Sequence, residues 1–266
     1  FSYVMHHIIS DGWSMSILVK ELMTLYTSYS SGQTSPLIPL RIQYKDYASW
    51  QQNELNGDKL TLHKAYWKEQ FSGNLPVLEL ATDKLRPSVK TYNGSTLQKT
   101  LSQSLSASIK TLSQEQGGTL YMGLLSLVNT LLYKYTNQED IILGSPIAGR
   151  EHMDLEGQIG FYVNTLALRN QFNSNENFIN IFAQVKNTTL GAFEHQAYPF
   201  DELLEELNLQ RDLSRNALFD VMVVLQNNEA SNIESTNRFG NLEVKTYNTP
   251  STVTSKFDLT FTFTES

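Results

Sequence analysis

Segments with helical spacing of apolar residues alternate with short apolar runs along the whole chain. Helices are expected near residues 12–29, 44–56, 60–71, 104–116, 119–136, 176–194 and 200–208. Strands are expected near residues 1–9, 95–101, 140–143, 161–168, 219–226, 242–247 and 256–264, with a polar loop at 227–239. Because the two kinds of segment mix throughout, the sequence predicts an α/β or α+β architecture.

An irregular stretch at residues 72–93 divides the pattern. Pro76, Pro87 and the dipeptide Asn93-Gly94 punctuate it, as in a linker between lobes. We therefore expect one lobe in residues 1–90 and a second in residues 91–266. Both ends of the chain fall within strand-like segments, so we expect the first lobe to be incomplete and the end of the second to be truncated.

The composition argues against several classes of function. The net charge of −7 argues against a nucleic-acid partner. The 266 residues include no cysteine, which excludes disulfides, thiolate metal sites and a cysteine nucleophile, and fits a cytoplasmic protein. We find no apolar run of about 18 residues, so no membrane span is expected.

The residues with the most chemical information are His6 and His7, followed by Asp11 and Gly12. In a strand, neighbouring side chains point to opposite faces, so only one of the two histidines can face a given cleft. A carboxylate at position 11 can brace the loop through backbone N–H groups or an arginine, and Gly12 gives the turn freedom. Histidine takes and returns a proton near neutral pH.

Other interpretations of the histidine doublet remain open at this point. The pair can be a structural feature at the end of a strand, packed in the core. A metal site with His6, His7 and Asp11 is less favoured, because adjacent strand residues point apart and no third histidine lies nearby. No G-x-S-x-G motif accompanies the doublet, so direct transfer is favoured over a covalent enzyme intermediate.

The histidine segment resembles the HHxxxDG motif of nonribosomal peptide synthetase condensation domains. Further segments resemble later motifs of that family, in the family's order: 44–51 (YKDYASWQ), 144–150 (GSPIAGR), 159–169 (IGFYVNTLALR), 195–200 (HQAYPF), 211–219 (RDLSRNALF) and 256–260 (KFDLT). A single HxxxD is weak evidence, but this ordered series runs nearly end to end.

The resemblance implies a chloramphenicol acetyltransferase-like fold, in which two lobes with mixed sheets and flanking helices form a V. It implies a tunnel that admits phosphopantetheine arms, with no directly bound cofactor and no metal. Donor and acceptor peptidyl carrier domains would deliver the arms, beside an adjacent adenylation domain. His7 would sit at the centre of the tunnel, Asp11 would be a structural brace, and Gly12 would lie close to the reacting groups.

The chain departs from the family pattern in two places. Ala197 stands where an acidic residue is common, and Ala217 where proline is common. The early family motif, whose arginine is expected to pair with Asp11, is absent from these 266 residues.

Three further residues are candidates for substrate binding. Asn164 lies among apolar strand residues, either as a hydrogen-bonded strand group or as a tunnel-lining group. Arg150 follows a buried strand, where a structural ion pair is favoured over a direct role in the cleft. Trp13 is expected to pack at the start of its helix, and a substrate contact is the second interpretation.

The resemblance implies an acyltransferase-type enzyme that forms an amide bond between two carrier-bound groups. One alternative is another HxxxD family member, either an epimerisation domain or an ester-forming acyltransferase. Trp13-Ser14-Met15 after Gly12 favours the condensation unit over the epimerase. A second alternative is a non-catalytic carrier-recruitment module that kept the fold.

Overall fold

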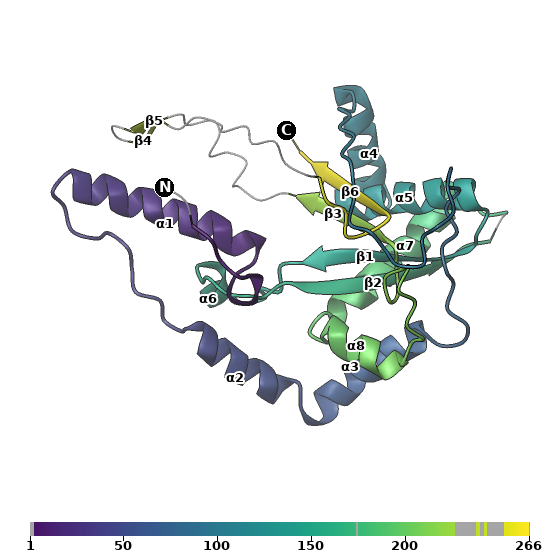
Figure 1. The fold of residues 1–266 in the computed structure, drawn as a ribbon, viewed down its shortest axis with the longest axis horizontal. Helices are drawn as coiled ribbons and strands as arrows, with labels where there is room; N and C mark the ends of the chain where they lie inside the picture. The colour runs from purple at the N-terminus through teal and green to yellow at the C-terminus, as the bar shows by residue number, and fades with distance from the viewer. Residues whose placement is uncertain (1–2, 174, 227–237, 240–241, 244–252, 266) are drawn as a thin grey trace. The chain divides into compact units, whose positions relative to one another are not determined.

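The computed structural model describes residues 3–173, 175–226, 238–239, 242–243 and 253–265 (Figure 1). Its contacts group into two compact units. The first comprises residues 1–57, 147–164 and 226–251, and the second comprises residues 58–146, 165–225 and 252–266. Each unit combines three separate segments of the chain, so the units do not test a single lobe boundary near residue 90. That boundary stays a prediction.

The first unit holds the amino-terminal helices. A short 3₁₀ turn, η1 (His7–Ile9), leads into α1 (Gly12–Ser30), and α2 (Tyr44–Glu54) follows. The short helix α6 (Met153–Glu156) belongs to the same unit. The two-residue strands β4 (Arg238–Phe239) and β5 (Leu242–Glu243) pair antiparallel.

The second unit is built on a four-stranded sheet of order β2-β1-β3-β6 (Figure 1). Its strands are β1 (Asp140–Ile147), β2 (Asn164–Gln171), β3 (Val221–Gln226) and β6 (Leu259–Thr264). β1 and β3 run parallel, with Gly144 opposite Met222. Its helices are α3 (Gly57–Gln70), α4 (Gln103–Glu115), α5 (Leu120–Thr136), α7 (Phe178–Glu194) and α8 (Phe200–Leu207).

The core of the second unit lies where α5 packs against α7 and where the central strands are buried. Residues of β1 form a nearly continuous buried run rather than an alternating one, as expected of a strand covered on both faces. Fully buried apolar side chains from the strands and helices fill this core: Leu125, Ile141, Leu143, Leu166, Leu168, Phe182, Val185, Val221 and Val223.

The predicted helices are confirmed with small shifts at their ends, and so are the strands at 140–143, 219–226 and 256–264, within longer or shorter bounds. The strand expected at 161–168 begins at Asn164 instead. Most of the loop expected at 227–239 and of the strand expected at 242–247 lies outside the described residues.

Two predicted strands are wrong. Described residues 3–6 are irregular and 7–9 form η1, because the His6 imidazole Nδ1 accepts a hydrogen bond from the Ile8 N–H and closes a local turn. Residues 95–101 are exposed and have no regular structure, and no described strand pairs with their backbone groups. Only an isolated bridge between Asn93 and Thr254 lies close to them in sequence.

Among the described helices, none has both the length and the apolar character needed to cross a bilayer.

A histidine pair joins α3 to the end of α7. The Nδ1 atoms of His63 and His195 lie 2.9 Å apart, and the Tyr66 ring stacks on His195 with a 4.1 Å centroid separation. The Trp67 indole N–H donates to the His195 carbonyl at 3.0 Å. Since two Nδ1 atoms at this distance need one donor and one acceptor, the contact cannot form when both rings are protonated.

Acidification is therefore expected to loosen this contact. Burial and the neighbouring His63 lower the pKa of His195, while the Glu194 carboxylate opposes them. Because the folded pKa is depressed, the unfolded chain binds more protons as the pH falls through about 6.5, and the contact loses stability there. Hydrogen exchange of α3 in the full-length protein, corrected for intrinsic rates, should rise between pH 7.5 and 5.5. His63→Gln should reduce this pH dependence, and equal slopes in both proteins would contradict the prediction.

Candidate active site

The two histidines have different environments. His6 caps η1 through its Nδ1, which accepts the Ile8 N–H at 3.1 Å, so its remaining proton lies on Nε2 when the ring is neutral. The exposed His7 ring packs perpendicular to the Phe161 ring, with centroids 5.5 Å apart. Among the described residues, no hydrogen bond engages the ring nitrogens of His7. His6 is therefore bonded within its own turn, whereas the His7 ring is free to bind an external group. The difference does not come from alternation along a strand, because these residues do not form one.

Asp11 fixes the end of the histidine loop. It is the N-cap of α1, and its Oδ1 accepts the Ser14 backbone N–H at 2.8 Å and the Ser14 hydroxyl at 2.7 Å. Its Oδ2 accepts the Tyr162 N–H at 3.1 Å. An N-cap carboxylate satisfies helix N–H groups that otherwise lack a partner. The predicted bracing role of Asp11 through backbone N–H groups is present in the structure.

The electrostatics of Asp11 keep its carboxylate ionised. Burial acts to raise its pKa, but hydrogen bonds from the Ser14 side chain and from the backbones of Ser14 and Tyr162, with the charge of Arg150, outweigh burial. The net result is a pKa below the ordinary value of aspartate. The carboxylate is thus a fixed negative charge at neutral pH and not a proton carrier.

Arg150 is the cationic partner of Asp11. Its Nη2 lies 3.2 Å from Asp11 Oδ1 and 3.4 Å from Oδ2, and the two side chains are 2% and 4% exposed. Its Nη1 donates to the carbonyl of Leu155 and, at 2.8 Å, to that of Gln158. Among the described residues, the arginine that pairs with Asp11 is Arg150, which lies 139 residues downstream. Pairing with an arginine of the early family motif, which is absent from these 266 residues, stays a prediction.

Ser14 connects the ion pair to a segment that precedes β2. Its Oγ lies 2.9 Å from the Gly160 carbonyl and accepts the Gly160 N–H at 3.1 Å, and Arg150 Nη2 donates to it at 3.1 Å. A hydroxyl carries one proton, so it donates either to Asp11 or to the Gly160 carbonyl at any moment. We call Asp11, Ser14, Arg150 and residues 158–162 the clamp.

Two glycines allow the clamp to close. A Cβ at Gly160 would collide with the rings of Tyr44 and Tyr162. Gly149 has φ of +63°, in the left-handed region, and a Cβ there would collide with the Tyr162 carbonyl. Arg150 can reach Asp11 because the backbone immediately before it adopts this turn.

Tyrosine rings back the clamp from the side of α2. Tyr162 packs on Tyr47, with ring centroids 4.6 Å apart, and the Arg150 guanidinium carbon lies 4.1 Å from the Tyr162 ring centroid. The Tyr162 hydroxyl donates to Gln158 Oε1 at 2.5 Å. Burial raises the pKa of Tyr47 and of Tyr162 to about 12, so both stay neutral and serve as packing and hydrogen-bonding groups.

The other predicted site residues lie as follows. The Trp13 indole N–H donates to the Glu156 carbonyl at 2.9 Å, which ties α1 to α6. Gly12 is the first residue of α1, does not have a positive φ, and a Cβ there would meet nothing within 4 Å. Turn freedom is therefore not the reason for this glycine. Asn164 opens β2 and is partly buried. Substrate contacts by Trp13, Asn164 or Arg150 stay predictions.

The metal interpretation of His6, His7 and Asp11 gains no support from the geometry. Both Asp11 oxygens already accept hydrogen bonds from the clamp, and His6 Nδ1 is occupied by a backbone N–H. Within the described part of the chain, no group of three or more histidine, aspartate or glutamate side chains is arranged to hold a metal ion.

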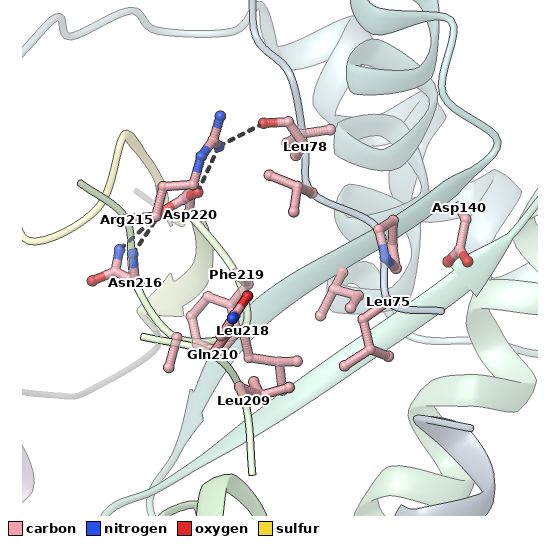
Figure 2. Close-up of a pocket in the computed structure, with 14 residues that line it drawn as sticks. Leu75, Leu78, Asp140, Leu209, Gln210, Arg215, Asn216, Leu218, Phe219 and Asp220 are labelled. Atoms are coloured by element: carbon pink, nitrogen blue, oxygen red, sulfur yellow. Dashed lines mark hydrogen bonds and ion pairs between the residues drawn. The ribbon is translucent and has the colours of Figure 1, made fainter. Parts of the chain in front are cut away.

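A cavity of about 280 Å³ in the second unit is another candidate site (Figure 2). Apolar side chains such as Leu75, Leu218 and Phe219 line it, but its charged groups already have partners. Asp140, also in the lining, accepts hydrogen bonds from Arg169. Arg215 donates to Asp220 at 3.1 Å and to the Leu78 carbonyl at 3.0 Å, as Figure 2 shows. These contacts hold the segment before α4 against the start of β3, which is a structural role.

Sequence reasoning did not select Ser14, Gln158, Gly160 or Tyr162 individually. Residues 159–169 were recognised as a motif, but only Asn164 was chosen from it. The signal that could have found the others was the position of Gly149-Arg150, since a charged residue after a buried strand needs a partner. That partner is Asp11, and its bond to the Tyr162 N–H leads to residues 158–162.

The comparisons with known proteins point to one family. The family model described as "Condensation domain" matches residues 1–266. The chain belongs to the condensation-domain family. A linear gramicidin synthase protein of Brevibacillus parabrevis is 43% identical over 266 residues, covering 100% of this chain and 5% of the relative. The predicted resemblance to nonribosomal peptide synthetase condensation domains is confirmed.

Solved structures confirm the condensation-domain fold. The X-domain from teicoplanin biosynthesis superposes with a TM-score of 0.81 at 22% identity, over 98% of this chain and 58% of that one. The first condensation domain of the CDA synthetase gives a TM-score of 0.64 at 19% identity, over 83% and 46%. The predicted chloramphenicol acetyltransferase-like α/β fold is therefore confirmed.

Breaking the clamp of this condensation domain should destabilise it strongly. Arg150→Met leaves the Asp11 carboxylate buried without its cation, and removal of one partner of a buried pair costs about 3–5 kcal/mol. Asp11→Ala should cost a similar amount, plus about 1 kcal/mol for the lost helix cap. The double variant should cost less than the sum of the single ones. The free energy of unfolding is measured by urea titration of the full-length protein, with hydrogen exchange of α1 as the readout. If the costs of the two single variants add up in the double variant, the pairing is contradicted.

The clamp should also be sensitive to acid. Because the folded pKa of Asp11 is depressed, its contribution to stability is complete above the unfolded value near 3.9 and is lost as the pH falls below it. Exchange protection of α1 should drop below about pH 4. Asp11→Asn should lack this component of the acid transition, and Asp201→Asn on α8 is a matched control that should retain it.

Proposed function

We propose that this condensation domain joins two carrier-bound groups through an amide bond. The donor is an acyl or peptidyl thioester and the acceptor is the amine of an aminoacyl thioester. The chain spans about 5% of the length of the linear gramicidin synthase protein that it matches, so the activity, substrates and partners of the whole protein are part of this proposal. Family membership supports acyl transfer in general, and the residue roles below are inferred from the geometry.

The observation that carries the proposal is the contrast between Asp11 and His7. Asp11 is buried, ionised and bonded on both oxygens, whereas the His7 ring four residues earlier is exposed and has no hydrogen bond to its ring nitrogens from a described residue. A rigid loop that presents one free imidazole is suited to proton transfer with an external group.

In the proposed reaction the acceptor amine attacks the thioester carbonyl. A neutral His7 imidazole accepts a proton from the attacking nitrogen, or stabilises the charge that develops on it. The new C–N bond forms as the C–S bond breaks, and the departing thiolate takes a proton. Because both reactants arrive tethered, proximity supplies much of the rate acceleration. No covalent enzyme intermediate is required.

The proposed partners follow from this chemistry. Donor and acceptor peptidyl carrier domains would deliver the groups on phosphopantetheine arms, and an adenylation domain would load the acceptor. His6 and Asp11 would support His7, and Gly12 would border the reacting groups. Trp13, Asn164 and Arg150 are retained as candidate lining groups. We place the protein in the cytoplasm, which fits a sequence without cysteine.

His7→Ala in the full-length protein should lower formation of the dipeptidyl-carrier product by about 10²- to 10⁴-fold, since it removes the proton acceptor. Intact-protein mass spectrometry of the loaded carriers measures the product. His6→Asn is the matched control, because the Asn amide oxygen can accept the Ile8 N–H in place of Nδ1. Unchanged turnover in His7→Ala would remove His7 from the mechanism.

The same loaded carriers separate the alternatives. Exchange of the α-proton of a carrier-bound residue in D₂O, without dipeptide, would indicate an epimerisation domain. Product formation with a hydroxyacyl but not an aminoacyl acceptor would indicate an ester-forming enzyme. Carrier binding with no turnover in the unaltered protein would indicate a recruitment module.

Gly12 offers a test of where the reactants lie. A Cβ at this position meets no described atom within 4 Å, so Gly12→Ala should leave stability unchanged or slightly raised. If the tethered groups pass over this backbone, turnover should fall, and Gly12→Leu should lower it further. Wild-type turnover in both variants would show that the open space above Gly12 is not used by the substrates.

A further inference from the structure

Among the described residues, the aromatic ring in contact with the His7 imidazole is that of Phe161. The His7 backbone carbonyl accepts the Ser10 N–H at 3.3 Å, which shapes the turn but leaves the side chain free to rotate. The Phe161 ring lies perpendicular to the imidazole, with centroids 5.5 Å apart and an interplanar angle of 82°. Aromatic pairs prefer this edge-to-face arrangement. The ring of Phe161 therefore limits the positions that the imidazole can take.

The backbone of Phe161 is held in place on both sides. The Tyr44 hydroxyl donates to the Phe161 carbonyl at 2.8 Å. The preceding Gly160 N–H donates to Ser14 Oγ, and the following Tyr162 N–H donates to Asp11 Oδ2. Phe161 is thus the clamp residue whose side chain contacts His7.

The side chain of Phe161 is unlike its neighbour's. Tyr162 is 4% exposed and packs in the tyrosine cluster, whereas Phe161 is 40% exposed. The Phe161 ring is therefore only partly covered by the rest of the described residues. Its position beside an exposed imidazole suggests a use at the site rather than in the core.

We propose that Phe161 is a positioning residue for His7. The clamp fixes the Phe161 backbone, and the Phe161 ring in turn restrains the His7 imidazole in the orientation that meets the acceptor amine. Tyr44 supports this by fixing the Phe161 carbonyl. The inference rests on the proposed function, because it assigns a partner to the histidine of that reaction.

The test compares Phe161→Leu with Phe161→Tyr in the full-length protein, using loaded donor and acceptor carriers. Phe161→Leu keeps an apolar side chain but loses the ring contact, so kcat should fall about three- to tenfold while KM for the carriers stays unchanged. Phe161→Tyr retains the ring and should keep wild-type kcat. Tyr29→Leu, at an exposed aromatic near the end of α1, is the control and should have no effect.

A double-mutant cycle with His7→Ala completes the test. In that background Phe161→Leu should cause no further loss, because there is no imidazole left to position. An equal loss in both backgrounds, or unchanged kcat in Phe161→Leu alone, would overturn the role of Phe161 while leaving that of His7 intact. Full turnover in His7→Ala would instead remove His7 from the mechanism, and absence of the dipeptidyl-carrier product with the unaltered protein would overturn the proposed function itself. Unaltered hydrogen exchange across residues 158–162 in Phe161→Leu would show that the clamp is intact.

Discussion

The buried ion pair between Asp11 and Arg150 is the contact on which the histidine loop depends. Taking two opposite charges out of water is costly, and their attraction offsets that cost only when the remaining hydrogen-bonding capacity is also satisfied. Here the carboxylate accepts from Ser14 and Tyr162, and the guanidinium donates to the Leu155 and Gln158 carbonyls. Of the polar atoms in these two side chains, Arg150 Nε alone is buried without a partner among the described residues. The ion pair therefore adds little net free energy of folding, but it fixes the position of the histidine loop.

The sequence predicted the fold class and most helices because their apolar spacing, caps and punctuation are local signals. The helices at 103–115 and 120–136, separated by Gly117-Gly118, are examples. The strand prediction failed for residues 3–9, because the His6 side chain takes the Ile8 N–H that a strand would need. It also failed for residues 95–101, because no described strand lies beside them to pair with. Strand formation depends on pairing with distant segments, which periodicity does not reveal.

The candidate site was predictable only in part for a related reason. His7 and Asp11 stand out within a short motif, and a structural ion pair was favoured for Arg150. The identity of its partner was not predicted, since a single sequence does not show which charges meet. Phe161 and Ser14 carry no signal of their own, because phenylalanine and serine are common in any chain. Their roles follow from the atoms that surround them.

The sequence distance across the clamp has a consequence for biosynthesis. Asp11 and Arg150 are separated by 139 residues, and Ser14 and Gly160 by 146. A ribosome adds about 5–20 residues per second, and domains fold largely as their segments emerge. The histidine loop must therefore wait for at least several seconds, with the Asp11 carboxylate still in water, until the downstream arginine has been synthesised. Its final geometry therefore forms only after Gly160 has been synthesised.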